Sequence, residues 1–320
     1  MGEDGLRHIY GPVPSRRLGR SLGIDLVPFK VCSYDCVYCQ LGRTTDKTVE
    51  RKHYVLLDEI LAELRERLEN ADRPDYISLA GSGEPTLHAG IGDLIRRIKD
   101  LTDIPVAVLT NGSLLWMPDV RDALMAADLV LPSLDAGDER SFLRVNRPHP
   151  AISFDQMVEG LVTFTEHFPG EVWLEVLLLK GITGTTAEAE EISTLIERIR
   201  PTRVQLNTAW RPSAEAGVRA LSAEEMVALQ TLLPGVVDII SEDARDEREG
   251  PTLSDAGDTD ILALLGRRPC TAADVAAGLS MHVAEALKHL DVLVASGAVT
   301  TVVIEGRTYY AAGHRETPGP

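Results

Sequence analysis

The sequence predicts an α/β protein with a parallel sheet, followed by a small domain of helices and a hairpin. Short β-like runs alternate with amphipathic helical runs from about residue 20 to 240. Residues 241–258 break this alternation, being acidic and rich in Gly, Pro and Ser. Residues 259–320 then show three short helical patterns and two β-like runs. Repeated strand–helix units favour parallel strands joined by helical crossovers.

Six runs in the first region have the length and β-branched content of buried strands. They are LGIDLV (22–27), YISLA (76–80), VAVLT (106–110), LVLPSL (129–134), VWLEVLLL (172–179) and RVQLNT (203–208). In the fifth run a single charged residue, Glu175, interrupts the apolar side chains. From these residues alone a partial barrel and a doubly wound sheet both remain open. Either fold places its ligands at the carboxyl ends of the strands.

A helical segment follows each predicted strand. In the first segment Leu57, Ile60, Leu61, Leu64 and Leu68 have the spacing of one apolar helix face. The other segments lie near residues 91–101, 118–127, 155–167, 187–199 and 222–232. This order is that of successive βα units.

The composition divides the chain into three regions. We expect a core domain with an N-terminal leader over residues 1–240, an acidic linker over 241–258, and a second domain over 259–320. In the second domain the helical patterns are followed by AVTTVVIEGRTYYAA, a predicted hairpin that turns at Glu305-Gly306. Three helices followed by a hairpin resemble a winged helix-turn-helix.

Composition and charge narrow the function classes. Hydrophobic residues make up 44% and charged residues 25% of the chain, as in ordinary globular proteins. The net charge of −17 argues against a surface that broadly attracts nucleic acid or anionic membranes. No apolar run approaches the roughly 18 residues of a membrane helix, and the first residues lack the apolar core of a signal peptide. We therefore expect a cytoplasmic protein, whose cysteines serve as metal ligands or catalysts more often than as disulfides.

Three of the four cysteines fall within KVCSYDCVYCQLG, directly after the first predicted strand. Cys32, Cys36 and Cys39 have the spacing C-x3-C-x2-C. Three thiolates on one short loop can hold one soft metal centre. An iron–sulfur cluster with three cysteine ligands and one open iron uses all three residues.

Two other interpretations of the cysteines are a zinc site and a redox dithiol. A zinc site requires a fourth ligand, which would have to be His53, Asp35 or Cys270, and none of these has a familiar spacing. A redox dithiol formed by the C-x-x-C pair leaves Cys32 without a role. Both readings explain the sequence less completely than an iron–sulfur cluster does.

The cysteine loop resembles that of the radical SAM superfamily, in which C-x3-C-x2-C carries an aromatic residue, here Tyr38, before its last cysteine. In that family the three cysteines bind a [4Fe-4S] cluster, whose open iron binds S-adenosylmethionine (SAM). Reductive cleavage of SAM gives methionine and a 5′-deoxyadenosyl radical, which abstracts hydrogen from a substrate. The resemblance implies that Cys32, Cys36 and Cys39 are cluster ligands. It also implies a partial (βα)6 TIM-like barrel of parallel strands.

A second motif follows the second predicted strand. Gly81-Ser82-Gly83-Glu84-Pro85 is similar to the GGEP motif of the family, with Ser82 where a glycine is common. Glycines let the backbone approach a ligand closely, and the resemblance implies that backbone carbonyls or Glu84 accept hydrogen bonds from the SAM ammonium. The same residues also fit an ordinary βα turn in which Pro85 opens a helix.

Further polar residues follow the later strands. Asn111 follows the third strand, and Ser133 and Asp135 follow the fourth. The resemblance implies that these side chains meet the ribose and carboxylate of SAM. After the fifth strand GITGTTAE is similar to the family's GxIxGxxE motif, and its Ile182 would pack against adenine. After the sixth strand, groups near Asn207 would complete the adenine site.

A narrower resemblance is to the wybutosine-synthase-like radical SAM proteins, through PSRRLG, CVYCQLG, NRPH and QLNT. Wybutosine enzymes modify a tRNA guanosine and bind a second cluster through additional cysteines, which this sequence lacks. We therefore expect a different reaction on an unidentified substrate, with RNA or tRNA modification as the first hypothesis. No catalytic residue is assigned. The resemblance also implies an electron donor such as a flavodoxin or ferredoxin.

Basic residues near the motifs could contact an anionic substrate. They are Arg16, Arg17, Lys30, Arg147, Lys180 and Arg211. The second domain supports nucleic-acid binding poorly, because residues 258–320 hold five Lys and Arg against seven Asp and Glu. The rival function is a redox- or metal-sensing regulator, with an iron–sulfur or zinc site and a DNA-binding winged helix. Such a sensor has no need for the SAM-like motifs at the strand ends.

Overall fold

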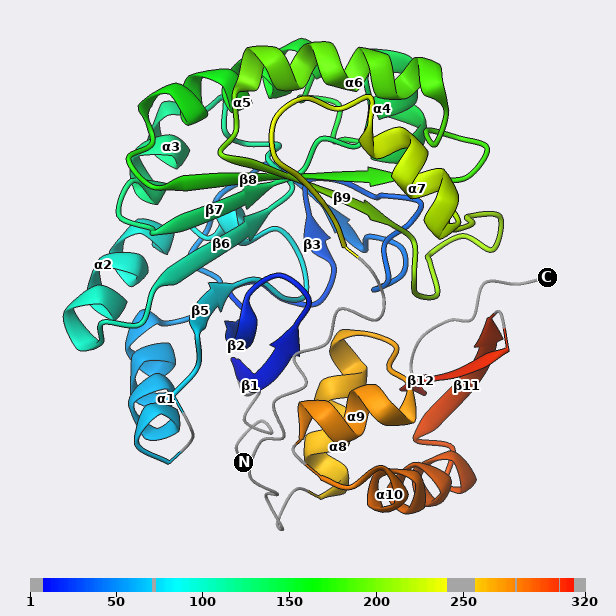
Figure 1. The fold of residues 1–320 in the computed structure, drawn as a ribbon. Coiled ribbons are helices and arrows are strands. Elements are labelled where there is room, and N and C mark those ends of the chain that lie inside the picture. The colour runs from blue at the N-terminus through cyan, green and yellow to red at the C-terminus, as the bar shows by residue number, and fades with distance from the viewer. Residues whose placement is uncertain (1–7, 71–72, 241–256, 280, 305, 314–320) are drawn as a thin grey trace.

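The computed structural model describes residues 8–70, 73–240, 257–279, 281–304 and 306–313. Its centre is an eight-stranded sheet in the order β1-β2-β5-β6-β7-β8-β9-β10. β1 and β2 are antiparallel, and every other neighbouring pair is parallel. The sheet curves, and helices cover its convex side (Figure 1). The predicted α/β class with a partial barrel is confirmed.

All six predicted strands are present in this sheet. They are β2 (Gly19–Ile24), β5 (Tyr76–Leu79), β6 (Val106–Thr110), β7 (Leu129–Pro132), β8 (Glu171–Leu178) and β9 (Arg203–Thr208). The two outermost strands, β1 (Ile9–Ser15) and β10 (Val237–Ile239), were not predicted. β1 contains two prolines, which are poor strand formers, and β10 has only three residues. A separate short ladder pairs β3 (Val31–Cys32) with β4 (Asp46–Lys47).

The predicted helices of the barrel are also present. They are α1 (Leu57–Asn70), α2 (Ile91–Leu101), α3 (Pro118–Leu124), α5 (Phe154–His167), α6 (Thr186–Ile199) and α7 (Ala223–Gln230). The apolar face predicted for α1 is buried, with Ile60, Leu61 and Leu64 at most 1% exposed. One short helix, α4 (Glu139–Val145), was not predicted. The side chain of Asp138 caps this helix by accepting a hydrogen bond from the Ser141 N–H.

The C-terminal region folds as predicted, with α8 (Asp258–Arg267), α9 (Ala272–Gly278) and α10 (Val283–Ala295) followed by the antiparallel strands β11 (Val299–Ile304) and β12 (Arg307–Ala312). Gly306 has φ +78° at the hairpin turn, while Glu305 lies outside the described residues. The predicted linker lies almost wholly outside them, so the domain boundaries stay a prediction.

The C-terminal domain packs against the first strand of the barrel. Val13 of β1 belongs to the same buried apolar cluster as Ile261 of α8 and Leu290 of α10. The Tyr309 hydroxyl donates a hydrogen bond to the Trp210 carbonyl at 3.1 Å, beyond the end of β9. Two parts of the barrel therefore hold this domain in place. Within the described part of the chain, each helix is too short or too polar to cross a membrane.

Candidate active site

The three clustered cysteines begin at the end of β3 and continue through the loop that follows. None of them forms a disulfide. Each sulfur accepts a hydrogen bond from a different side chain. The pairs are Asn111 Nδ2 with Cys32 Sγ at 3.6 Å, Asn146 Nδ2 with Cys36 Sγ at 3.6 Å, and Lys30 Nζ with Cys39 Sγ at 3.2 Å. Donors of this kind offset negative charge on a thiolate or on sulfur bound to metal.

Burial favours the neutral form of these thiols. It raises the pKa of Cys32 to about 12, with the Glu84 carboxylate as a smaller cause in the same direction. Burial also raises the pKa of Cys36 well above its ordinary value, and the nearby Asp135 adds to the increase. A bound metal centre supplies the positive charge that stabilises thiolates at such positions. The loop therefore suits metal binding better than a free redox dithiol.

The spacing of the sulfurs distinguishes a cluster from a single ion. Among the described residues, one group of three possible ligand side chains has all its ligand atoms within 4.8 Å of one another, namely Asp138, Glu188 and Glu191. The three cysteine sulfurs do not form such a group. A single zinc ion with Zn–S bonds of about 2.3 Å would hold its sulfurs only about 3.8 Å apart. A larger centre with several metal ions fits the wider spacing.

Asp135, which follows β7, supports the cysteine loop through hydrogen bonds. Its carboxylate accepts hydrogen bonds from the Tyr38 hydroxyl, from Asn146 Nδ2 at 2.8 Å and from the Leu177 N–H at 3.2 Å. Asp135 is 3% exposed, and burial raises its pKa to about 6. Both carboxylate oxygens are thus engaged within the protein. Its geometry is that of a residue that positions Tyr38 and Asn146, rather than one that faces a ligand.

Glu84 joins the ends of β5 and β6 in a similar way. One carboxylate oxygen accepts hydrogen bonds from the Thr86 N–H at 3.0 Å and from the hydroxyls of Thr86 and Thr110, both at 2.6 Å. The other oxygen accepts one from the Asn111 N–H at 2.7 Å. Glu84 is 2% exposed, and burial raises its pKa despite these hydrogen bonds. Pro85 opens a short 3-10 helix, Pro85–Leu87, as the turn interpretation predicted.

The glycines of the second motif allow a close approach between loops. A Cβ atom on Gly83 would lie 1.8 Å from the carbonyl oxygen of Val31, the residue before Cys32. A Cβ atom on Gly81 would lie 2.4 Å from Cγ of Asp25. The Asp25 carboxylate also accepts hydrogen bonds from the N–H and the hydroxyl of Ser82. The motif therefore fixes the turn against β2 and against the start of the cysteine loop.

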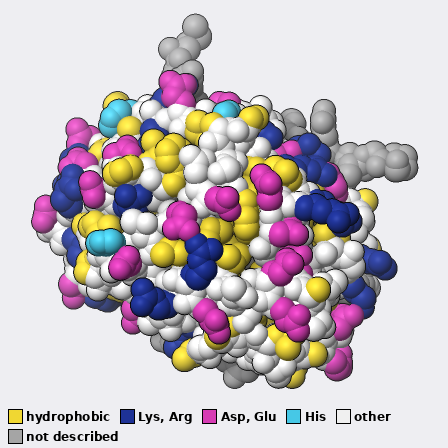
Figure 2. Space-filling model, turned by 90° about the horizontal axis from the view of Figure 1, so that it is seen from above, with side chains coloured by type: hydrophobic (Ala, Val, Ile, Leu, Met, Phe, Trp, Pro, Cys, Tyr) yellow, Lys and Arg dark blue, Asp and Glu magenta, His cyan; other side chains and the backbone are white. Residues whose placement is uncertain are grey.

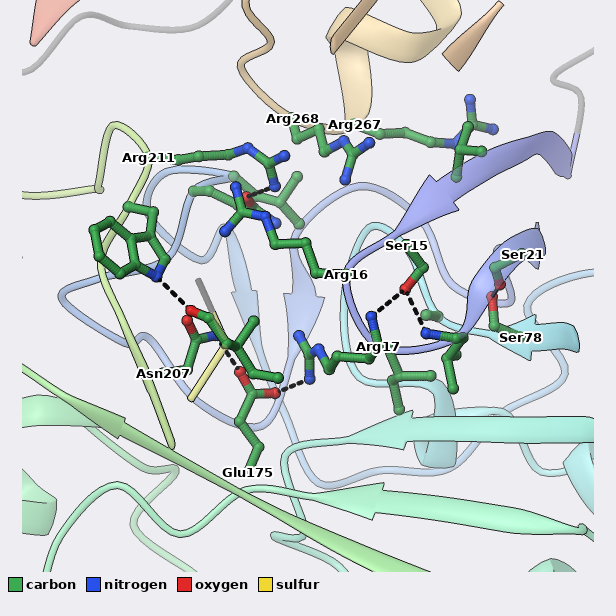
Figure 3. Close-up of a pocket in the computed structure, with 18 of the residues that line it drawn as sticks. Ser15, Arg16, Arg17, Ser21, Ser78, Glu175, Asn207, Arg211, Arg267 and Arg268 are labelled. Carbon is green, nitrogen blue, oxygen red and sulfur yellow. Dashed lines mark hydrogen bonds and ion pairs between the residues drawn. The ribbon is translucent and has the colours of Figure 1, made fainter. Parts of the chain in front are cut away.

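A cavity of about 460 Å³ lies between the barrel and the C-terminal domain (Figure 3). Four of the residues predicted to bind the cluster or SAM line it, namely Tyr38, Cys39, Gly81 and Asn207. The Asn207 side chain donates a hydrogen bond to Glu175 at 2.8 Å. The other residues predicted to bind the cluster or SAM do not line this cavity. Ile182 packs beside Tyr38 in a small apolar cluster, and Ser133 pairs with Glu175 in a parallel bridge.

The basic residues named from the sequence lie among other charged and polar side chains. The partners of four of them are as follows. Arg17 pairs with Glu175, Arg147 with Glu215, Lys180 with Glu225 at 2.8 Å, and Lys30 donates to Cys39. Arg16, Arg17 and Arg211 line the cavity.

Several residues of the site were missed from the sequence. Asn146 lies in the quoted NRPH segment, but it had no assigned role. Glu175 was visible as the one charge inside an apolar strand, which is an unusual place for a carboxylate. Arg267 and Arg268 end α8 and line the cavity from the C-terminal domain, and only the packing of the two domains brings them there.

Comparison with known families identifies this arrangement. Residues 26–192 match the model of the radical SAM superfamily. The chain belongs to the radical SAM superfamily. It is accordingly a radical SAM enzyme that uses a [4Fe-4S] cluster and SAM, and its substrate is unassigned. Residues 260–302 match the model of a helix-turn-helix domain.

Among curated relatives, the enzyme is 33% identical to a UPF0026 protein of Helicobacter pylori strain J99, over 98% of this chain and 100% of that protein. It is 36% identical to a UPF0026 protein of Methanocaldococcus jannaschii, over 71% of each chain. It is also 41% identical to a protein named GTPase Obg from Brachyspira hyodysenteriae, over 95% of this chain. That match spans only 45% of the Brachyspira protein.

Solved structures agree on the fold. A radical SAM methyltransferase from Sphaerobacter thermophilus is similar with a TM-score of 0.53 and 17% identity, over 70% of this chain and 69% of that chain. SuiB from Streptococcus suis is similar with a TM-score of 0.51 and 14% identity, over 68% of this chain and 49% of that chain. At these identities the likeness supports the barrel fold, not a shared substrate.

Proposed function

We propose that Cys32, Cys36 and Cys39 hold the [4Fe-4S] cluster of this enzyme and leave one iron open for SAM. The observation that carries this proposal is that three sulfurs on one loop each have a separate donor and are spaced too widely for one zinc ion. Together with SAM and one electron, the bound cluster supplies a 5′-deoxyadenosyl radical for hydrogen abstraction. A small electron-transfer protein such as a flavodoxin or ferredoxin is the proposed donor.

The SAM site lies in this proposal between the cysteine loop and the ends of β5, β8 and β9. Gly81 and Asn207, which line the cavity, and Ile182, which packs beside Tyr38, are its proposed contact residues. Ser133 and the side-chain amide of Asn111 lie near the same strand ends. Glu84 and Asp135 act through other residues, because their oxygens already accept four and three hydrogen bonds from the protein. Ser82, Gly83 and Pro85 shape the turn.

The narrower assignment is to the wybutosine-synthase-like group, on the motifs quoted above. RNA modification, the first substrate hypothesis, finds little support in surface charge. On the face shown in Figure 2, acidic and basic side chains are interspersed and form no broad basic patch. The helix-turn-helix match is the one observation that favours a DNA-binding regulator. Two observations count against DNA binding. Arg267 and Arg268 of that domain line the internal cavity, so they do not form an outer basic surface. On α10 the one lysine, Lys288, is offset by two acidic residues, Glu285 and Asp291.

The test is to measure 5′-deoxyadenosine. The full chain is reconstituted with iron and sulfide without oxygen and given SAM and dithionite. Cys36→Ala removes a proposed ligand, and Cys270→Ala removes the cysteine outside the loop as a matched control. We expect about four irons per chain and 5′-deoxyadenosine from the wild type and the control, and neither from Cys36→Ala. Equal iron content and product from both variants would overturn the ligand assignment.

A further inference from the structure

The cavity beside the cysteine loop concentrates positive charge in an acidic protein. Five arginines and two carboxylates line it, whereas the whole chain has a net charge of −17. The arginines come from three segments that are distant in the sequence. Arg16 and Arg17 lie in the turn after β1, Arg211 in the loop after β9, and Arg267 and Arg268 at the end of α8. Figure 3 shows Arg16, Arg211 and Arg268 extending toward one another along one side of the cavity.

Two of the five arginines contact residues that form the walls of the cavity. Arg17 forms an ion pair with Glu175, and the pair lies near the strand ends. Arg267 donates a hydrogen bond to the Ala263 carbonyl at 2.9 Å and lies over the Tyr10 ring at 4.5 Å. These contacts fix the walls of the cavity. The five arginines outnumber the two carboxylates, Glu175 and Asp274, so the lining of the cavity keeps an excess of positive charge.

Arg211 is at the centre of this group. Its side chain is 15% exposed, and its Nε is buried without a hydrogen-bond partner among the described residues. The remaining nitrogens have only long contacts, at 3.5 Å to Gln40 Oε1 and 3.9 Å to Asp274 Oδ1. A buried guanidinium with an unused donor is costly, so this donor calls for an acceptor that the described residues do not supply.

Like charges surround this guanidinium. Burial, then repulsion from Arg268 and from Arg16, lower the pKa of Arg211 to about 10, although the nearby Asp274 carboxylate acts in the opposite direction. Three mutually repelling cations in one cavity are stabilised together by a single polyvalent anion. Guanidinium groups also match the geometry of phosphate oxygens, because each can donate two parallel hydrogen bonds.

We propose that Arg16, Arg211 and Arg268 bind the phosphate group of a small phosphorylated substrate, and that the C-terminal domain completes this subsite by supplying Arg268. The inference rests on the proposed function, since it names the substrate class of the same site. Cys39 and Tyr38 line the same cavity, so a bound phosphate ester shares one space with the edge of the cysteine loop. The helix-turn-helix domain thereby serves as part of the substrate pocket, not as a DNA reader.

The dimensions of the cavity favour a small molecule over RNA. Its volume of about 460 Å³ falls in the range of roughly 300–1,000 Å³ that is usual for small-molecule sites. The C-terminal domain also closes over it, with α9 packed against β1 and Tyr309 bonded to Trp210. A folded RNA would contact an extended basic surface, whereas here the arginines converge inside one pocket.

The test measures binding by calorimetry to the full chain with its reconstituted cluster. The probes are inorganic phosphate, ribose 5-phosphate, ribose and a short single-stranded RNA. Arg268→Gln removes one proposed donor at a partly exposed position. Arg268→Lys keeps the positive charge but cannot donate two parallel hydrogen bonds as a guanidinium does. Arg73→Gln is the matched control, because Arg73 is an exposed arginine paired with Asp103. The unfolding temperature of each variant verifies that it folds.

We expect both phosphate probes to bind and ribose not to bind. Arg268→Gln should weaken phosphate binding roughly tenfold to a hundredfold, as the loss of a charge-assisted hydrogen bond does. Arg268→Lys should be intermediate, and Arg73→Gln should equal the wild type. The proposal fails if neither phosphate probe binds at millimolar concentration, or if Arg268→Gln and Arg73→Gln bind alike. It also fails if RNA alone binds in an Arg268-dependent way. Because 5′-deoxyadenosine is measured separately, wild-type SAM cleavage without phosphate binding would overturn this inference and leave the proposed function intact.

Discussion

Replacing Gly83 with alanine should weaken both the fold and the retention of iron. Gly83 lies where the second motif passes the start of the cysteine loop. An added Cβ atom would lie 1.8 Å from the Val31 carbonyl oxygen and 2.9 Å from Cγ2 of Val27. The first of these atoms belongs to the backbone, so it cannot move away by a change of rotamer. Because Val31 is bonded to Cys32, its displacement moves a proposed cluster ligand.

The magnitude follows from two contributions. Forcing one extra carbon into a closely packed backbone contact costs about 1–3 kcal/mol. The displaced carbonyl also accepts a hydrogen bond from the Glu84 N–H at 3.1 Å, and its loss costs about 1 kcal/mol. The free energy of unfolding should therefore fall by about 2–4 kcal/mol. At about 2–4 °C per kcal/mol, the unfolding temperature should fall by roughly 5–15 °C.

The assay compares Gly83→Ala with Gly217→Ala by thermal unfolding and by iron content after reconstitution. Gly217 is the matched control, since a Cβ atom there has no neighbour within 4 Å. We expect a lower unfolding temperature and less bound iron only in Gly83→Ala. Equal unfolding temperatures and equal iron in the two variants would refute the argument that this glycine is required by close packing.

Three further substitutions test other parts of the site and its surroundings. Glu84→Gln places an amide donor against backbone N–H donors, so the free energy of unfolding should fall by about 1–3 kcal/mol in a thermal unfolding experiment. The control, Glu224→Gln, changes an exposed side chain and should cause no such loss. Equal losses in the two variants would contradict this argument. His88 bonds backbone groups through both ring nitrogens at 3.1 Å, and burial lowers its pKa below 6.5. The unfolded state therefore binds the proton more readily, so the wild type should lose stability as the pH falls below 6.5, and His88→Gln should lose less. Parallel plots of unfolding free energy against pH for the two proteins would refute this. Tyr38→Phe removes a hydrogen-bond donor to the buried Asp135, so the free energy of unfolding should fall by about 1–3 kcal/mol. An unchanged unfolding temperature would count against a supporting role for the Asp135 carboxylate.

The parts of the fold that were predictable are those determined locally. Parallel strands buried on both faces are short apolar runs, so the six βα units could be predicted from the sequence. β1 could not be predicted, because its Pro12 and Pro14 are unfavourable in strands. The strand depends on its pairing with β2, which the local sequence does not show. α4 has only seven residues, too few for its periodicity to stand out.

The same distinction applies to the site. The three cysteines are neighbours in the chain, so their spacing alone indicated a metal centre. Asp135 contacts Tyr38 of the loop from 97 residues away and Asn146 contacts Cys36 from 110 residues away, and such separations carry no local signal. The motif predicted that backbone carbonyls or Glu84 accept hydrogen bonds from SAM, and only the folded chain shows that four donors are already directed at the Glu84 carboxylate. The meeting of Arg211 with Arg268 depends on how two domains pack, which no single segment encodes.

The packing of the C-terminal domain on β1 has a consequence for how the chain is made. β1 is one of the two edge strands of the sheet, and α9, which packs against it, is synthesised about 260 residues later. At about 5–20 residues per second, the nascent edge waits roughly 13–50 s for its covering helix. Unpaired edges are templates for aggregation, and proline removes backbone donors from them. At Pro12 and Pro14 the backbone of β1 has no N–H to offer to another strand, so β1 should be a poorer template during this interval than a strand without proline.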